Sequence, residues 1–572
     1  MIRRTTQPAP AAQQGLNAWS PAETAAAVAV GVALYLLPLT FDVPLLDPDE
    51  GLHAAIAQGM VERGDWLMPR FLGEPFPDKP ILFFWAQALS LWLLGFSETA
   101  VRLPGLLFGA LGALATGLLA REWFGTRVGW LAGLCYATML LPVGVAQAAV
   151  HDIALVPWVA FALRAFTRAS RETRAARSFA HAAAAGAWLG LALLTKGLTG
   201  VAIVGLAHAL TLLIGRRLRA LDVAGGVVAL ALAAAIASPW YLWMEAASPG
   251  YLRYFFVDRH VLGFATTTQT HGQRPWWYYL PLLAAGGLPW VAHVLADLAT
   301  RRRTEVPVDR DPSHAEGCRF AWLWLGSALV FLSTAGSKLV TYLLPALPAV
   351  ALLAGLAWAR WLDRAGRTDR RVGLAGLGVA SAALALALPG ALVAGSVVTG
   401  IGAGAPAWAG GLALAVAWQA PWVAWSRGLR PSAYWLTVGL VVATTLFGLG
   451  VVMPRLAPSL SAKALSAELN RRGNLPERLW VFDERIGSLV FYLDPSLRHR
   501  LTPSRVENIT ADRLLSMRQP PSGLVIAVPE DRLAWLARRV DLSRAPFDSA
   551  GRYRIYTAEA FHAAVAQATG RR

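Results

Sequence analysis

Ionisable side chains interrupt otherwise apolar sequence at a few places along this chain. The acidic pair Asp49-Glu50 follows an apolar run, and Lys79 stands between Asp78 and Pro80. Charged groups beside or within apolar segments cost free energy and by default mark function. The remaining candidates are His151-Asp152, Lys196 in LLTKGLTG, Asp258-Arg259-His260 in YFFVDRHVLGF, Arg274 before PWWYYLP, and Lys338 and Tyr342 in SKLVTYLLPALP.

Two acids and several cations at one membrane surface suit the transfer of a sugar from a lipid phosphate. When the bond between sugar and phosphate breaks, negative charge grows on the phosphate, and fixed Lys and Arg groups stabilise it. The sugar carbon passes through an oxocarbenium-like state that a nearby carboxylate can stabilise. If the acceptor is a hydroxyl, a carboxylate can also take its proton.

Each of these residues also has a purely structural explanation. A lysine at a helix end usually extends to the lipid headgroups, and this explains Lys196 and Lys338 as well as function does. A loop carboxylate is usually solvated or caps a helix, and we interpret Asp47, before Pro48, as such a turn residue. Asp49 and Asp152 fit this explanation less well, because both stand at the ends of apolar runs.

The elements that must position these side chains are membrane helices. The chain has 572 residues, 56% of them hydrophobic and 15% charged, with a mean hydropathy of +0.45. Soluble domains carry about 25% charged residues. Apolar runs of about 20 residues predict a polytopic all-α membrane protein of about thirteen spans. They are 22–41, 101–120, 127–147, 150–168, 179–195, 198–215, 222–243, 276–299, 319–335, 338–359, 372–396, 405–426 and 431–453.

The distribution of arginine predicts which loops face the cytoplasm. The apolar segment 81–96 is short for a span. If it is left out and the N-terminus is cytoplasmic, every arginine-dense loop lies inside, in accord with the positive-inside rule. The segment 81–96 is therefore interpreted as a re-entrant or interfacial helix, and all the candidate residues lie on the outer face. The net charge of +17 reflects these loops rather than a nucleic-acid partner.

The chain divides into a cytoplasmic tail (1–21), a membrane part (22–454) with a first periplasmic loop (42–100), and a C-terminal domain (455–572). The last alternates β-like runs (RLWVFDE, SLVFYLD, GLVIAV, YRIYTA) with helical ones (SAKALSAELNRRG, EDRLAWLARRV), which predicts a small periplasmic α/β domain. Cys135 and Cys318 form no disulfide framework or CxxC metal site.

Several motifs carry a resemblance to a known family. They are Asp49-Glu50, GDW (64–66) with Pro69, Asp78-Lys79-Pro80, AVHDIAL, LTKG, RPWWYYLP and SKLVTYLLP, in this order along the membrane part. The chain resembles bacterial lipid-linked glycosyltransferases of the GT-C class. Within that class it is most similar to the aminoarabinose transferases that modify lipid A, and more distantly to protein O-mannosyltransferases.

The resemblance implies roles for individual residues. Asp49 and Asp152 match required acids of the family, Lys79 matches its phosphate-binding lysine, and Tyr342 and an arginine of the long outer loop, here Arg259, match groups that contact the phosphate. To these we add Glu50 as a catalytic residue, Lys338 as a residue that would bind the lipid phosphate, and His53, His151 and Lys196 as residues that would contact sugar or acceptor. Arg259 is preferred over Arg274, which stands next to Pro275 and can simply order its loop. The family often has an arginine soon after the acidic pair, where this chain has GLHAA with His53, so the sugar can differ from aminoarabinose.

The sequence thus predicts an inverting glycosyltransferase of the bacterial inner membrane with a periplasmic active site. The expected donor is a sugar on undecaprenyl phosphate, and the acceptor is lipid A or, alternatively, a protein or polysaccharide, with membrane lipids around the site. No cofactor is required, and a divalent metal is compatible with the carboxylates and His151 on that face. Two rivals from other classes are a lipid-linked sugar transporter, with charges near the bilayer midplane, and a non-catalytic assembly factor that docks through its tail.

Overall fold

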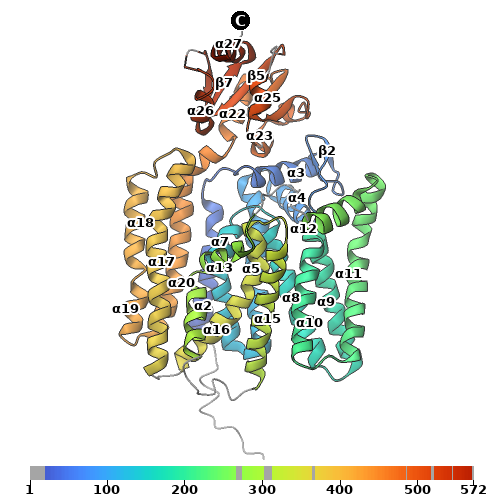
Figure 1. Cartoon of the computed structure of the whole chain (residues 1–572), viewed down its shortest axis with the longest axis vertical. Coiled ribbons are helices and arrows are strands. Elements are labelled where there is room, and N and C mark those ends of the chain that lie inside the picture. The colour runs from blue at the N-terminus through green and yellow to red at the C-terminus, as the bar shows by residue number, and fades with distance from the viewer. Residues whose placement is uncertain are drawn as a thin grey trace, which may run out of the picture.

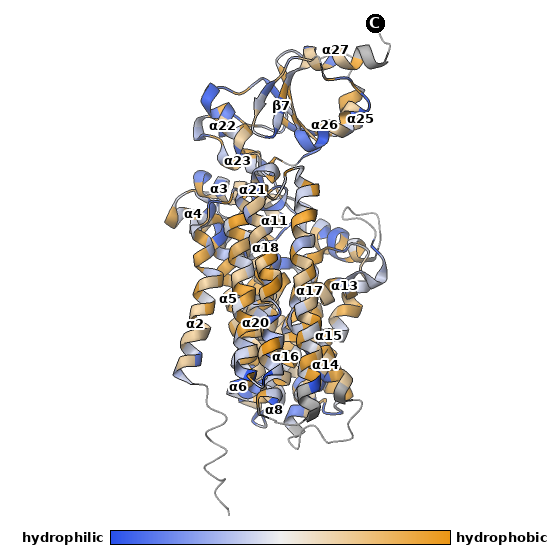
Figure 2. Ribbon diagram, turned by 90° about the vertical axis from the view of Figure 1, so that its left-hand side faces the viewer, coloured by the Kyte–Doolittle hydropathy of each residue, from blue (hydrophilic) through white to orange (hydrophobic). Residues whose placement is uncertain are grey.

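The computed structural model describes residues 20–265, 274–301, 312–363, 367–484, 486–516, 521–543 and 545–569. Long helices form a bundle, and a small domain that contains a β-sheet stands on one end of it (Figure 1). Hydrophobic residues cover the bundle, and hydrophilic residues gather at its two ends and in the small domain (Figure 2). This is the distribution expected of a multi-pass membrane protein with one extramembranous domain.

All thirteen predicted apolar segments are helical, but not all are unbroken spans. Among the described residues nine helical segments are long and apolar enough to cross a membrane, or eleven if two sharply bent pairs each count as one. The other two are the predicted spans 198–215, a helix of 17 residues, and 405–426, which is interrupted at Trp418 and Gln419. The two halves of the interrupted segment follow one another along the bundle (Figure 1).

The bundle consists of helices from residue 21 to residue 460. They are α2 (Pro21–Tyr35), η1 (Leu37–Thr40), α5 (Glu98–Phe124), α6 (Thr126–Ala137), α7 (Leu140–Ala146), α8 (Asp152–Arg171), α9 (Ala175–Lys196), α10 (Leu198–Ile214), α11 (Ala220–Ala247), η2 (Arg253–Leu262), α12 (Gly263–Ala265), η3 (Trp276–Tyr278), α13 (Tyr279–Gly286), α14 (Trp290–Arg301), α15 (Pro312–Thr334), η4 (Val340–Ala346), α16 (Leu347–Asp363), α17 (Arg367–Thr399), α18 (Ala405–Ala417), α19 (Ala420–Ser426), α20 (Arg430–Phe447), η5 (Gly448–Val452), α21 (Met453–Leu456) and η6 (Ala457–Leu460).

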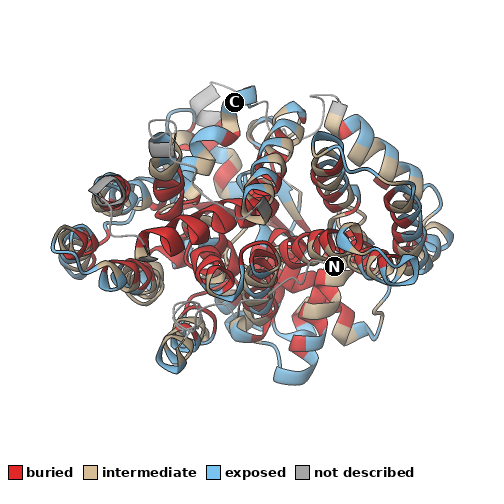
Figure 3. Ribbon diagram, turned by 90° about the horizontal axis from the view of Figure 1, so that it is seen from below, coloured by how far each residue is buried: buried red, intermediate tan, exposed pale blue. Residues whose placement is uncertain are grey.

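Burial is greatest in the middle of the bundle. The segment Val340–Leu362, which includes α16, is 83% buried, whereas α2 with η1 is 17% buried and faces outward. Seen from below, buried residues concentrate in the centre and exposed ones at the flanks (Figure 3). Lipid tails are as apolar as these side chains, so an outward-facing helix needs no protein neighbour on its lipid-facing side.

The end of the bundle opposite the small domain carries the arginine-rich loops. Arg164 and Arg168 both pair with Glu122, and Arg217 pairs with Glu316. Ion pairs therefore join the end of α5 to α8, and the turn after α10 to the start of α15. By the positive-inside rule an arginine-rich surface of this kind is the one expected to face the cytoplasm.

The segment between η1 and α5 folds against the end of the bundle that carries the small domain. It contains α3 (Asp49–Arg63), the short strands β1 (Arg70–Phe71) and β2 (Glu74–Pro75), and α4 (Leu82–Leu94). A left-handed Gly64 (φ 68°) ends α3. The helix α4 has 13 residues and lies near this end of the bundle (Figure 1). It is too short to cross a bilayer by itself, as the sequence indicated for 81–96.

The C-terminal domain is built on a five-stranded mixed sheet of order β4-β3-β5-β7-β6. β3, β4 and β5 are parallel, and β6 and β7 complete the sheet in antiparallel pairs. The elements are α22 (Lys463–Arg472), β3 (Arg478–Phe482), α23 (Gly487–Tyr492), α24 (Pro495–Arg498), β4 (Val506–Ile509), α25 (Ala511–Leu515), β5 (Leu524–Pro529), α26 (Glu530–Ala537), β6 (Asp548–Ala550), β7 (Tyr553–Thr557) and α27 (Ala558–Thr569).

One expected strand of this domain is wrong. The run SLVFYLD (488–494) was predicted to be β-like, but Gly487–Tyr492 forms the helix α23. A short apolar run cannot be assigned to helix or strand from its periodicity alone. Here burial decides the outcome, because five of the six residues of α23 are buried, and the helix packs on α3.

Candidate active site

A cavity of about 150 Å³ opens where several predicted site residues meet. Lys79, Lys196, Arg259 and Tyr342 all line it, although they come from four different parts of the chain. The wall also includes the apolar side chains of Phe255, Phe264, Phe331 and Leu332 and the polar ones of Asp78, Thr199, His260 and Ser337. A phosphate on a lipid tail requires cations for the phosphate and an apolar wall for the tail, and this cavity has both.

Lys196 connects this cavity to Asp152. The first residue of α8 and the last residue of α9 form an ion pair, and each side chain is only 11% exposed. The Lys196 ammonium also lies 4.0 Å from the centre of the Tyr342 ring. A buried ion pair with an aromatic face beside it fixes both charges in place, so Asp152 and Lys196 act as one unit.

Arg259 is positioned by a second carboxylate. Its guanidinium lies 3.2 Å from Asp78 Oδ1, and the Tyr254 hydroxyl donates to the same carboxylate. Arg259 and His260 belong to η2, which has π-helical geometry. Such wider turns leave backbone groups available to side chains and are common at functional sites.

His260 fills the space between η2 and the turn after α9. Its Nδ1 lies 2.7 Å from the Phe255 carbonyl oxygen and its Nε2 lies 3.3 Å from that of Lys196. Burial lowers the pKa of His260 below its ordinary value. Gly197 has φ 65°, and a Cβ there would stand 2.4 Å from His260 Nε2. The glycine of LTKG is therefore required by both its backbone conformation and its neighbour.

His53 and His151 lie together beneath the site. Their ring centres are 4.4 Å apart, they are 4% and 1% exposed, and His151 also contacts Phe83 and Phe84. Burial, helped by the charge of Lys79 and opposed by the Ala149 carbonyl, Asp49 and Glu50, lowers the pKa of His53 to about 4, so the imidazole is neutral at physiological pH. Both ring nitrogens of His151 are buried without a hydrogen-bond partner.

Asp49 is exposed at the first turn of α3, and its charge acts on both His53 and Tyr342. Its neighbour Glu50 lies in a different environment. Glu50 is 4% exposed and accepts two hydrogen bonds from Arg102, each of 2.8 Å, and further ones from the Leu46 and Ala149 amides. These bonds occupy both carboxylate oxygens, so Glu50 stabilises the turn before α3. Glu50 is not among the residues that line the cavity.

Two other candidate cations lie outside the lining that the structure describes. The Lys338 ammonium is buried and donates to the Ala335 carbonyl oxygen at 2.5 Å, just after the end of α15. Arg274 is exposed and faces the Tyr278 ring at 5.8 Å. Of the two arginines considered from the sequence, Arg259 therefore lines the cavity.

Sequence reasoning missed the partners of the site residues more than the residues themselves. Arg102, Asp78 and His260 were not assigned roles, although each holds a predicted residue or lines the cavity. Arg102 could have been found, because it is a lone cation near the start of an apolar segment. Across the residues described, no group of three or more His, Cys, Asp or Glu side chains is placed to hold a metal ion.

The Asp152–Lys196 pair gives a direct test of this geometry. We expect Asp152→Asn to lower the free energy of unfolding by about 3–5 kcal/mol, because it leaves a buried ammonium without its counter-ion. The double variant Asp152→Asn/Lys196→Met should recover much of this loss. Thermal unfolding of the detergent-solubilised chain measures both. Equal losses in the single and double variants would contradict the pairing, and Asp548→Asn, in an exposed pair with Arg472, is the control.

Comparisons with known proteins show which proteins this chain is similar to in sequence and in fold. Residues 78–243 match the family model for dolichyl-phosphate-mannose-protein mannosyltransferases. Two curated relatives are undecaprenyl phosphate-α-4-amino-4-deoxy-L-arabinose arabinosyl transferases. The one from Erwinia tasmaniensis is 33% identical over 320 residues (56% of either chain), and the one from Pseudomonas fluorescens is 34% identical over 357 residues (62% of this chain, 61% of that one). The chain thus spans about three fifths of the length of the curated relatives that it matches.

Solved structures extend the likeness to almost the whole chain. The crystal structure of ArnT from Cupriavidus metallidurans bound to undecaprenyl phosphate superposes with a TM-score of 0.70 at 24% identity, covering 94% of this chain and 98% of that one. The same protein in the apo state gives a TM-score of 0.66 at 23% identity. The fold is therefore that of ArnT, with a multi-span helical membrane part and a small C-terminal α/β domain.

Proposed function

We propose that this chain, a homologue of the aminoarabinose transferases in the superfamily that also contains protein mannosyltransferases, is a membrane glycosyltransferase with a polyprenyl-phosphate sugar donor. One observation carries the proposal. Lys79, Arg259 and Tyr342 line a single cavity whose other wall is apolar, and the Asp152–Lys196 pair adjoins it. A lipid phosphate and the first units of its tail match both walls. Undecaprenyl phosphate, named for the relatives, is the carrier that we assign.

The reaction follows from the placement of the charges. The donor phosphate lies between Lys79 and Arg259, with the Tyr342 hydroxyl beside it. The bond between the anomeric carbon and the phosphate oxygen breaks, and its electron pair stays on the phosphate, where the two cations stabilise the added charge. The acceptor oxygen forms the new bond from the opposite face of the sugar, which inverts the anomeric configuration. Asp49 and Asp152 orient the acceptor and the sugar.

The chemical nature of the acceptor determines whether Asp49 must act as a general base. A phosphate acceptor, such as that of lipid A, is already ionised and needs no strong general base. A protein or polysaccharide hydroxyl must lose a proton, and Asp49, an exposed carboxylate whose charge acts on Tyr342 of the cavity, is the group to take it. Lipid A is our first candidate because the curated relatives are arabinosyl transferases, and His53 in place of an arginine favours a sugar other than aminoarabinose as the alternative.

The position of the cavity also favours a glycosyltransferase over a transporter of lipid-linked sugars. A transporter places its charged groups near the bilayer midplane, between two halves of the fold. Here Gly263 and Phe264 of α12 line the cavity, and α12 lies in the half of the bundle nearer the C-terminal domain (Figure 1). With the arginine-rich loops in the cytoplasm, this half faces the periplasm of a bacterial inner membrane.

A deletion strain tests the function directly. Mass spectrometry of lipid A, glycans and envelope proteins, with and without a plasmid copy of the gene, should show one sugar-bearing species that disappears on deletion and returns on complementation. A copy with Lys79→Ala should fail to restore it. If no sugar-bearing species changes in any of the three fractions, the chain is not a transferase of this kind.

A further inference from the structure

The C-terminal domain is joined to the first turn of α3 by an unusually close contact between α23 and α3. A Cβ on Gly51 would stand 2.3 Å from the Ser488 amide nitrogen, and a Cβ on Gly487 would stand 2.1 Å from that of Leu52. No side chain separates the two backbones there, so a glycine on each side is required. The hydrophobic cluster beneath is continuous as well, because Ala54 and Ile56 of α3 share it with Leu489 and Val490 of α23.

Asp47, which precedes α3, is the polar centre of this contact. It is not the solvated turn residue that the sequence indicated. Its carboxylate accepts hydrogen bonds from the Ser488 amide, at 2.9 Å, and from the Ser488 hydroxyl. Its own amide donates to the Leu460 carbonyl oxygen at 2.9 Å, and the Ser488 hydroxyl accepts from the Ala462 amide at 2.8 Å. Three segments of the chain therefore meet at one carboxylate.

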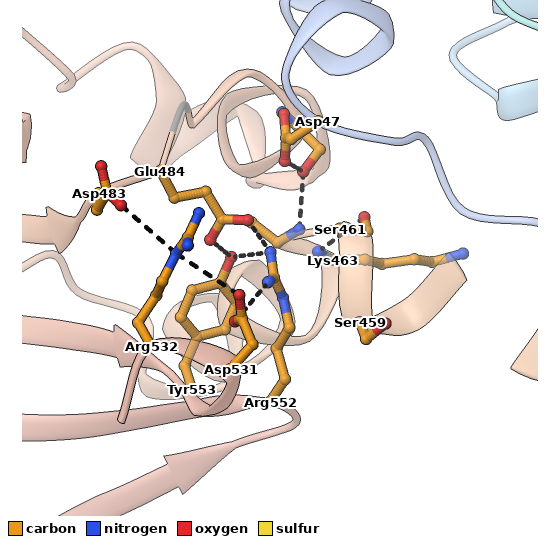
Figure 4. A network of polar contacts seen from close by, with 12 residues as sticks. Asp47, Ser459, Ser461, Lys463, Asp483, Glu484, Asp531, Arg532, Arg552 and Tyr553 are labelled. Atoms are coloured by element: carbon orange, nitrogen blue, oxygen red, sulfur yellow. Dashed lines mark hydrogen bonds and ion pairs between the residues drawn. The ribbon is translucent and has the colours of Figure 1, made fainter. Parts of the chain in front are cut away.

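A second group of charges in the C-terminal domain faces the same point (Figure 4). Glu484 forms an ion pair with Arg552 and accepts a hydrogen bond of 2.6 Å from the Tyr553 hydroxyl. Asp531 lies 3.5 Å from Arg552 on the other side. Burial raises the pKa of Asp47 to about 7, with Glu484 raising it and Ser488 and Arg552 opposing the rise.

Further contacts fix the remaining parts of this region. The Tyr492 hydroxyl accepts from the Leu45 amide at 2.8 Å and lies 2.9 Å from Glu98, and Arg498 pairs with Glu62 near the end of α3. From Asp47 the contacts lead into the site. The turn that it begins carries Asp49 and Glu50, and Glu50 accepts from the Ala149 amide, whose carbonyl oxygen lies 3.0 Å from His53 Nδ1.

We propose that the C-terminal domain is a positioning element of the reaction. Through the contact of Asp47 with Ser488, α23 holds the first turn of α3, and this sets the Asp49 carboxylate relative to Lys79 and Tyr342. The proposal rests on the transferase function proposed above. A displacement of about 1 Å at a reacting group costs on the order of 100-fold in rate, so the domain contributes to turnover without contacting the donor. Asp47 and Ser488 are positioning residues.

The test uses the full chain in detergent or lipid nanodiscs, with Asp47→Ala as the disrupting variant and Asp47→Asn as the conservative one. We expect Asp47→Ala to lower kcat by about 10-fold or more, while the Kd for undecaprenyl phosphate changes less than about 2-fold. Hydrogen–deuterium exchange of the amides in 49–53 should accelerate, whereas exchange in α8 should not. Asp47→Asn keeps a side-chain oxygen for the Ser488 amide and should recover most of the kcat.

The pH dependence of amide exchange in 49–53 adds a measurement that a general loss of folding would not explain. Because the pKa of Asp47 is raised when the domain is docked, the protonated carboxyl is favoured there, and docking weakens as pH rises from about 4 to about 7, then levels off. Exchange protection in 49–53, corrected for intrinsic exchange rates, should fall across that window in the wild type. In Asp47→Asn this fall should be lost, because the carboxyl whose pKa is raised at the contact has been removed.

The outcomes separate this inference from the proposed function. Asp548→Asn, on the same domain but away from α3, should match the wild type in all measurements. If Asp47→Ala loosens 49–53 and leaves kcat unchanged, or leaves both unchanged, the positioning role is wrong. If the fall of kcat in Asp47→Ala is fully accounted for by a smaller fraction of folded protein, as thermal unfolding measures it, the positioning role is equally wrong. If the wild type transfers no sugar, the proposed function fails, and the exchange experiment still decides whether the domain holds α3.

Discussion

Replacement of Lys79 by alanine is expected to abolish sugar transfer and to weaken binding of the donor phosphate at the same time. The charge of Lys79 acts on His53, His151, Lys196 and His260, so it stands at the centre of the polar wall. Removal of one fixed donor from a shielded charge-stabilising site costs about 10²–10³-fold in rate. We expect kcat/KM to fall by about that factor, measured as transfer of a radiolabelled sugar from the lipid donor.

The fold should survive this substitution, which makes the result interpretable. Lys79 lines a cavity and is not part of a hydrophobic cluster, so Lys79→Ala should remain folded, and its unfolding temperature is measured beside that of the wild type. Arg253→Ala is the matched control, because Arg253 lies on the same segment as Arg259 but is exposed. Unchanged affinity of Lys79→Ala for undecaprenyl phosphate would remove Lys79 from the phosphate site.

Asp49→Asn should produce the second large effect, and its size should report the acceptor. The substitution keeps the shape of the side chain and removes the charge that acts on His53 and Tyr342. If Asp49 takes a proton from a hydroxyl acceptor, kcat should fall by about 10²–10⁴-fold. If the acceptor is an ionised phosphate, the loss should be far smaller. In both cases the affinity for the donor should be almost unchanged.

Glu50→Gln is the natural comparison, because it removes the same charge one residue later. Glu50 is buried and pairs with Arg102, so its loss should lower the thermal stability of the chain before it changes kcat. The two variants are measured together by unfolding temperature and by turnover at saturating donor. The assignment of roles fails if Glu50→Gln, still fully folded, loses more turnover than Asp49→Asn does.

Hydropathy and arginine placement made the membrane part predictable. Each apolar run from 22–41 to 431–453 is helical, in one piece or in two or three, because a spanning segment must satisfy its backbone hydrogen bonds internally whatever its neighbours are. The number of spanning helices falls below the predicted thirteen where a helix is short, as in α10, or interrupted, as at Trp418. The short segment α4 also has the length that the sequence indicated, since 13 residues cannot cross a bilayer.

Four of the predicted site residues line the cavity, whereas the partners that hold the predicted residues in place were not predicted. The predicted residues that do not line it are Asp49, Glu50, Asp152, His53, His151 and Lys338. Lys79, Lys196, Arg259 and Tyr342 stand out because each interrupts apolar sequence, and all of them reach one cavity. The sequence offered no pattern that would show Glu50 bound to Arg102, 52 residues away. Charge type identifies which residues can take part in chemistry, whereas the separation of two charges in space depends on how the helices pack.

The amino-acid sequence alone therefore determined the helices, the sidedness that the arginines predict and the charged residues that interrupt apolar sequence, because these follow from local composition. Tertiary structure decided the rest. It turned SLVFYLD into a helix and bound Asp47 to Ser488, 441 residues away. It also left Asp49 exposed while its neighbour Glu50 was buried. These outcomes depend on packing between distant segments, and no period or spacing along the chain encodes such contacts.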